Sequence, residues 1–124
     1  MIWPAFALLL LSAPCDPAGG QFYSQLNREY FGNKLEAACI QYQDHYMEAG
    51  YYASTEKADN GGYLIVLDSR FRELPSYGKL AIEHEACHID TWDDTALVDK
   101  QQHGPPWKHC MRRLALEGAM DDLW

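Results

Sequence analysis

The alternation of apolar and polar positions predicts a small β-sheet in the middle of the chain. Residues 37–42 and 51–55 have the composition of strands. Residues 63–67 read Tyr-Leu-Ile-Val-Leu and predict a buried strand, because β-branched and aromatic side chains favour a packed, pleated surface. The preceding Asp59-Asn60-Gly61-Gly62 is a strong turn signal. The sequence therefore predicts three short strands.

Helical periodicity surrounds these strands. Phe22, Leu26 and Tyr30 recur at helical spacing and predict a helix over residues 21–31, preceded by a linker at residues 16–20. A short helical turn is expected over 70–74, a helix over 77–92 with Ser76 as its start signal, and a last helix over 104–116. The pattern predicts an α+β domain in which a small sheet packs against helices.

The expected helix over 77–92 carries His84-Glu85-Ala86-Cys87-His88. Positions i and i+4 share one face of a helix, so both imidazoles can reach one metal ion. In zinc peptidases with this spacing, the glutamate after the first histidine is the general base. The motif therefore predicts zinc ligands at His84 and His88 and a catalytic role for Glu85.

A catalytic zinc site requires a third protein ligand, and three candidates follow the motif. His103 precedes a Gly-Pro-Pro turn that would hold its ring in place, and the chemistry favours it. Asp94 lies where the last ligand of a longer zinc motif would fall, but Thr91 occupies the position where that motif needs glycine. Glu117 stays open as an acidic alternative near the C-terminus. His45 and His109 are interpreted as surface or core histidines rather than ligands.

These residues together resemble a known family. His84-Glu85-x-x-His88 followed by His103-Gly104-x-x-Trp107-Lys108-x-x-Met111 resembles the SprT-like zinc metallopeptidases, as do residues 26–35 and the strand 63–67. The resemblance covers about residues 21–117 and rests chiefly on the second element, since the first is shared by many zinc peptidases. It implies a zincin-like domain over residues 21–124, with His84, His88 and His103 as Zn²⁺ ligands and Glu85 as base. The implied activity is hydrolysis of a protein or peptide substrate.

Two features limit what the resemblance implies about function. The chain has no paired CxxC motifs of the zinc ribbon that many relatives carry, so a zinc-binding module without peptidase activity, a scaffold or regulator, is the alternative. The net charge is −8, with 18 acidic against 10 basic residues, which opposes a phosphate backbone and argues against autonomous nucleic-acid binding. The basic cluster Lys108, Arg112 and Arg113 is interpreted as a solvated helix face.

The N-terminal residues and the cysteines concern the compartment. Residues 2–13 are apolar and uncharged; they are too short to span a bilayer stably but suit a signal peptide, with small residues for cleavage at Ala18-Gly19-Gly20. On that interpretation residues 1–20 are removed and the protein is exported; otherwise it is cytoplasmic. Cys87 is expected to face away from the ligands as a core residue. A Cys39–Cys110 or Cys87–Cys110 disulfide is expected only in an exported protein.

Four further features, three aromatic residues and one strand, are assigned a packing role or a role at the site. Trp107 is expected to be a core anchor beneath the His103-Gly104 turn. Tyr63 and Tyr77 could donate to an oxyanion, although packing is the favoured role for both. The final strand, if it lies at an edge of the sheet, could pair with an extended peptide substrate.

Overall fold

The computed structural model describes residues 14–92 and 103–123. Its elements, in chain order, are α2 (Pro17–Tyr30), β1 (Ala38–Gln43), the 3₁₀ turn η1 (Met47–Ala49), β2 (Ala53–Lys57), β3 (Tyr63–Asp68), the 3₁₀ turn η2 (Ser69–Arg72), α3 (Pro75–Asp90) and α4 (Pro105–Leu116). The fold is the expected α+β domain with one small sheet. The expected strands and helices are all present, shifted by a few residues at their ends.

The three strands lie in the order β1-β3-β2. β1 runs parallel to β3, with Ile40 opposite Ile65, and β2 runs antiparallel to β3, with Thr55 opposite Ile65. The condition under which the final strand would pair with a peptide substrate is therefore not met, because β3 is central. Five of its six residues are buried, which agrees with a strand that has neighbours on both sides. The edges of this sheet are β1 and β2.

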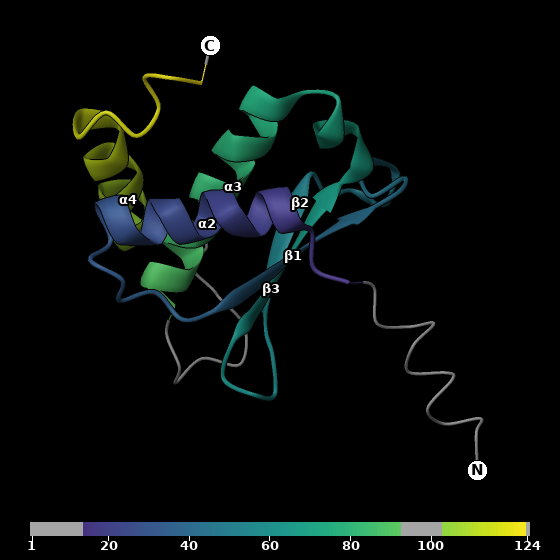
Figure 1. The fold of residues 1–124 in the computed structure, drawn as a ribbon, viewed down its shortest axis with the longest axis horizontal. Coiled ribbons are helices and arrows are strands. Elements are labelled where there is room, and N and C mark those ends of the chain that lie inside the picture. The colour runs from purple at the N-terminus through teal and green to yellow at the C-terminus, as the bar shows by residue number, and fades with distance from the viewer. Residues whose placement is uncertain (1–13, 93–102, 124) are drawn as a thin grey trace.

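The helices enclose the core of the domain (Figure 1). α2 contacts β1 and α3, while α3 also contacts β2, β3 and α4. α3 thus touches more of the fold than either other helix, and its motif residues are held from several directions. The largest fully buried apolar side chains of the core are Ile40, Ile65, Leu67 and Leu114.

The segment expected to be a linker is instead the first turn of α2. The Asp16 side chain accepts a hydrogen bond of 2.8 Å from the Gly19 N–H and caps the helix, and Pro17 occupies its first turn, where a missing N–H has no cost. Gly19 is buried against Ile40 of β1. The linker prediction was wrong because Asp-Pro, read as a turn, is also a helix start signal. Cleavage at residues 18–20 would remove this cap. The predicted signal segment 2–13 lies outside the described residues.

The start of α3 also differs from the prediction. Leu74 is the N-cap residue and makes no side-chain cap hydrogen bond, and Pro75 is the first helical residue. Ser76 therefore lies inside the first turn rather than before it. The fixed φ of proline initiates the helix here without a side-chain cap.

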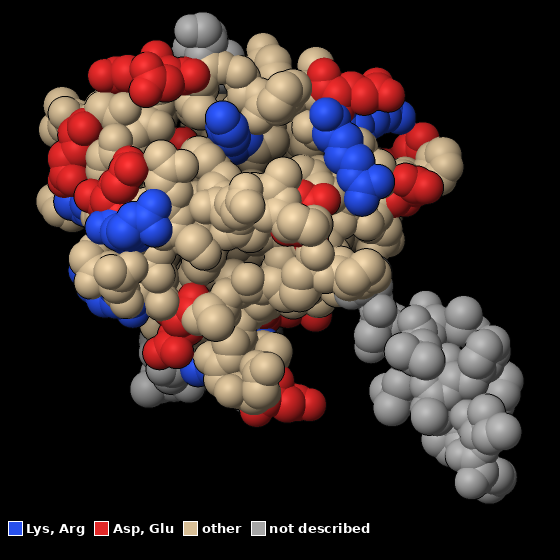
Figure 2. All heavy atoms as spheres, in the orientation of Figure 1, with Lys and Arg blue, Asp and Glu red and all other residues tan. Residues whose placement is uncertain are grey.

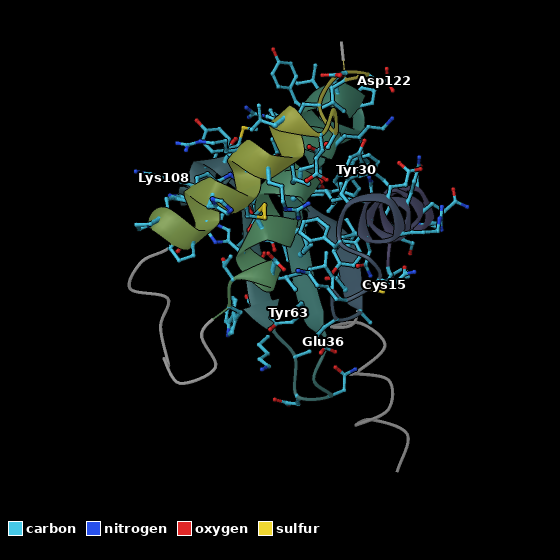
Figure 3. The ribbon with its side chains drawn as sticks, turned by 90° about the vertical axis from the view of Figure 1, so that its left-hand side faces the viewer. Cys15, Tyr30, Glu36, Tyr63, Lys108 and Asp122 are labelled. Carbon is cyan, nitrogen blue, oxygen red and sulfur yellow. A yellow bond between two sulfur atoms is a disulfide. The ribbon has the colours of Figure 1, made fainter. Side chains whose placement is uncertain are left out.

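Two disulfides tie the elements together. Cys15 bonds to Cys39 and holds the start of α2 to β1, and Cys87 bonds to Cys110 and joins α3 to α4 (Figure 3). The first pairing excludes the Cys39–Cys110 alternative, and the second was anticipated. Cys87 and Cys110 are both buried, as expected for Cys87. Within residues 14–92 and 103–123, no helix is long and apolar enough to cross a membrane.

Candidate metal centre

Three histidines meet where the C-terminal half of α3 faces the start of α4. The Nε2 atom of His84 lies 3.2 Å from Nε2 of His88 and 3.1 Å from Nε2 of His103. One ligand atom from each ring lies within 4.8 Å of the others. The helical spacing places the first two rings together, and the turn before Pro105 brings the third to them. The structure thus joins the two motif histidines to the favoured third candidate.

This arrangement fits a metal ion. Ligands at about 2.0–2.1 Å from a tetrahedral Zn²⁺ lie roughly 3.3 Å from one another, close to the two nitrogen separations given above. Three imidazoles are also a donor set that catalytic zinc sites use, with one position left for water or substrate. The three side chains could therefore hold such an ion without rearrangement of the helices.

Trp107 supports the histidines from α4. Its indole Nε1 donates a 3.2 Å hydrogen bond to the backbone oxygen of His84. Its ring centroid lies 4.7 Å from that of His84, 5.6 Å from that of His88 and 4.5 Å from that of His103. The expected packing role is confirmed, and its place is more specific than expected: the indole touches all three imidazoles and limits their rotation.

Glu85 is buried beside the cluster, with 4% of its surface exposed. One carboxylate oxygen accepts a 2.8 Å hydrogen bond from Thr55 Oγ1 on β2, and the other lies 3.6 Å from His84 Nε2. Burial raises the Glu85 pKa to about 7, although the Thr55 hydrogen bond acts in the opposite direction. The hydrogen bond thus fixes the position of the carboxyl group. Its pKa lies near neutral pH, which suits a group that both accepts and donates a proton.

His84 is held in its neutral form. Burial lowers its pKa to about 4, and the neighbouring His88 and His103 act in the same direction. A neutral imidazole leaves a nitrogen lone pair free to bind a metal, whereas the protonated ring has none. The electrostatics of the cluster therefore favour metal binding over protonation.

Of the two remaining candidate ligands, the structure describes Glu117. The Glu117 carboxylate is 3.2 Å from Arg113 Nη1 at the C-terminal end of α4 and is not part of the cluster. Asp94 lies outside the described residues. His45 is exposed and pairs with Glu48 at 3.1 Å, and His109 is exposed on α4, in line with their expected surface roles.

The two tyrosines considered for oxyanion binding differ in place. Tyr63 is buried in the core, with its ring 5.4 Å from Trp92, so its packing role is confirmed. Tyr77 instead lines a cavity of about 390 Å³ that opens against His84, Glu85 and His103. The other walls of this cavity come from the segment between β1 and β2 and from η2, which the sequence did not mark as part of a site.

Two further residues, Thr55 and Glu83, were not singled out by the sequence pattern. Thr55, with Glu85 as its acceptor, looked like any strand threonine. Glu83 is fully buried, burial raises its pKa to about 7, and among the described residues neither of its side-chain oxygens has a hydrogen-bond partner. A neutral Glu83 is consistent with the apolar core around it.

The charged surface gives no sign of a nucleic-acid interface on the visible face. Basic side chains there are scattered among acidic ones rather than gathered into one patch (Figure 2). Within the predicted basic cluster, Arg113 lies 4.8 Å from the Phe31 ring and donates to the Tyr30 carbonyl oxygen and to Glu117. Arg113 is thus engaged by its own fold, and Lys108 points outward from α4 (Figure 3).

Comparison of the sequence with models of protein families shows which family the chain belongs to. The model of the SprT-like family matches residues 20–121, which is most of the chain. The chain belongs to the SprT-like family. No curated protein and no solved structure matched. The SprT-like match begins inside α2 and includes the sheet and the histidine cluster, so the resemblance seen in the motifs extends over most of the described fold.

Proposed function

We propose that this SprT-like domain is a zinc-dependent peptidase in which His84, His88 and His103 hold the metal and Glu85 is the general base. The observation that carries the proposal is the combination of three converging imidazoles with a buried carboxylate 3.6 Å from one of them. A purely structural zinc site needs no such carboxylate.

The side chains suit the chemistry of hydrolysis. Zn²⁺ held by three histidines would lower the pKa of a water molecule and polarise the scissile carbonyl. Glu85 would accept the proton of the attacking water and return it to the leaving amine. Thr55 fixes the orientation of the carboxylate, and burial keeps its pKa near 7. Trp107 keeps the histidine rings in place.

The proposed substrate is an extended polypeptide along β2. β2 is an edge strand, and Thr55 in its middle touches Glu85. A peptide added to this edge would gain backbone hydrogen bonds and pass beside the base. This replaces the expected pairing with the final strand, which is central. The acidic charge of −8 favours a protein substrate over autonomous binding to nucleic acid.

An oxidising compartment is proposed for the protein. All four cysteines are paired, two of them inside the core. Structural disulfides persist in exported proteins and are rare in the cytosol. This supports the export interpretation of the N-terminal segment, with any cleavage on the N-terminal side of Cys15.

Zinc content and hydrolysis of a generic unfolded protein test the function. The purified chain should contain about one zinc per molecule, degrade fluorescent casein, lose the activity with a chelator and regain it with Zn²⁺. His103→Ala should lower the zinc content, while the exposed control His109→Ala should not. A zinc-loaded protein that cleaves nothing would favour the alternative, a binding module. Unchanged zinc in His103→Ala would move the third ligand elsewhere.

A further inference from the structure

We infer that the cavity beside Glu85 receives one bulky apolar side chain of the substrate, so that the enzyme selects aromatic or large aliphatic residues next to the scissile bond. The inference rests on the proposed peptidase function and adds its specificity. The cavity measures about 390 Å³, near the lower end of the 300–1,000 Å³ typical of small-ligand pockets. Its inner wall contains His84 and Glu85, so an occupant lies directly beside the reacting groups.

The lining determines the chemistry of the occupant. Apart from the histidines and Glu85, the wall is built from glycine, alanine, leucine and aromatic side chains, chiefly Tyr51, Tyr52, Phe71, Tyr77, Leu80 and Ala81. None of the described lining residues is a lysine or arginine, and the only carboxylate is Glu85. A charged substrate side chain would lose its hydration there, and the one lining carboxylate is the proposed base, whereas an apolar side chain would gain from burial.

The outer wall is built in advance. Asp68 is fully buried, and its carboxylate accepts hydrogen bonds from the N–H groups of Met47 at 2.7 Å and Arg70 at 2.8 Å. The backbone N–H of Asp68 donates a 2.9 Å hydrogen bond to the backbone carbonyl oxygen of Tyr52. Asp68 therefore ties the segment carrying Tyr51 and Tyr52 to the turn carrying Phe71. A fixed wall lowers the ordering cost that a substrate must meet on binding.

The exposure of the wall points to a transient occupant. Tyr51, Tyr52 and Tyr77 are 53%, 69% and 53% exposed, although all three line the same cavity. The Tyr51 ring is also held by a stack on Tyr46, with centroids 5.3 Å apart. Clustered exposed aromatics next to reactive groups are characteristic of a recognition surface rather than a core. A substrate side chain would cover them only while bound.

A peptide library tests the selectivity directly. The zinc-loaded protein is incubated with peptides of randomised sequence, and cleaved bonds are located by mass spectrometry. Phe, Tyr, Leu and Met should be enriched at one position adjoining the cleaved bond. In matched peptides differing only there, Phe should exceed Ala, Lys and Asp in kcat/KM by about ten- to a hundredfold.

Two variants and a control link the preference to the cavity. Ala81→Leu fills the pocket and should move the preference from Phe towards Ala or Val. Tyr52→Ser opens the wall and should raise KM for the Phe peptide several-fold with kcat less affected. Leu116→Ala removes an apolar side chain that is 81% exposed at the far end of α4 and should change neither value.

Binding without turnover supplies an independent reading. Calorimetric titration of zinc-loaded Glu85→Gln should give tighter binding of the Phe peptide than of the Ala or Lys peptide, and Ala81→Leu in that background should abolish the difference. Cleavage with no apolar enrichment, or an unchanged preference in both cavity variants, would overturn the inference and leave the peptidase proposal standing. A zinc-loaded protein that cleaves no peptide would overturn both.

Discussion

Thr55 Oγ1 donates a 2.8 Å hydrogen bond to Glu85 Oε1, and this contact joins the edge strand β2 to the helix that carries the histidine cluster. The two residues are 30 positions apart in the chain. On the proposed function, the strand that would align a peptide also orients the base, so substrate position and proton transfer would be coupled through one hydroxyl.

Replacing Thr55 by valine should lower kcat by about ten- to a hundredfold, because a base displaced by a fraction of an ångström loses its alignment. Zinc content and KM should change little. Thr55→Ser keeps the hydroxyl and should restore most of the rate, which a purely structural role of the side chain would not explain. Full activity in Thr55→Val would show that the hydrogen bond does not position Glu85.

The close packing of α2 on β1 gives a stability prediction with an internal control. A Cβ on Gly19 would lie 2.8 Å from Ile40 Cγ2, whereas nothing lies within 4 Å of a Cβ on Gly20. Gly20→Ala should raise the free energy of unfolding by about 0.5–1 kcal/mol through helix propensity. Gly19→Ala gains the same helix propensity, but its methyl group overpacks the core. The overpacking outweighs the gain, so this variant should lower the free energy of unfolding by about 1–2 kcal/mol. Urea unfolding of both variants measures the difference. Equal effects would contradict the packing of α2 against β1.

The disulfides should differ in their resistance to reduction. Cys15 is exposed, whereas Cys87 and Cys110 are buried. Thiolate attack requires access to a sulfur atom, so mild reductant should open Cys15–Cys39 first. Alkylation followed by peptide mapping gives the order. Labelling of Cys87 and Cys110 before Cys15 would contradict the burial of the second bridge, and free thiols in the native, untreated protein would contradict the proposed compartment.

Local patterns were sufficient to predict most of the elements. The β-branched run at residues 63–67 and the helical spacing of His84 and His88 each depend on neighbours in sequence, and both appear in the structure where expected. Asp16-Pro17 was ambiguous, because the same dipeptide starts turns and helices, and only the contact of Gly19 with Ile40 resolves it.

Local motifs were sufficient to predict the three histidines of the cluster and the packing of Trp107, but not the contacts that distant segments make around them. The Cys15–Cys39 bridge, the Thr55–Glu85 hydrogen bond and the cavity wall formed by Tyr51 and Tyr52 all depend on contacts between distant segments. The central place of β3 likewise follows from strand order rather than from its own composition alone. No period or motif in the sequence encodes these relationships.

The most direct test of the central claim compares the native protein with Glu85→Gln in one experiment that measures both zinc content and casein hydrolysis. Gln has nearly the same shape but cannot accept the proton of water, so the variant should keep its zinc and lose at least about a hundredfold in rate. Zinc retained together with hydrolysis at the native rate would contradict the assignment of Glu85 as the general base.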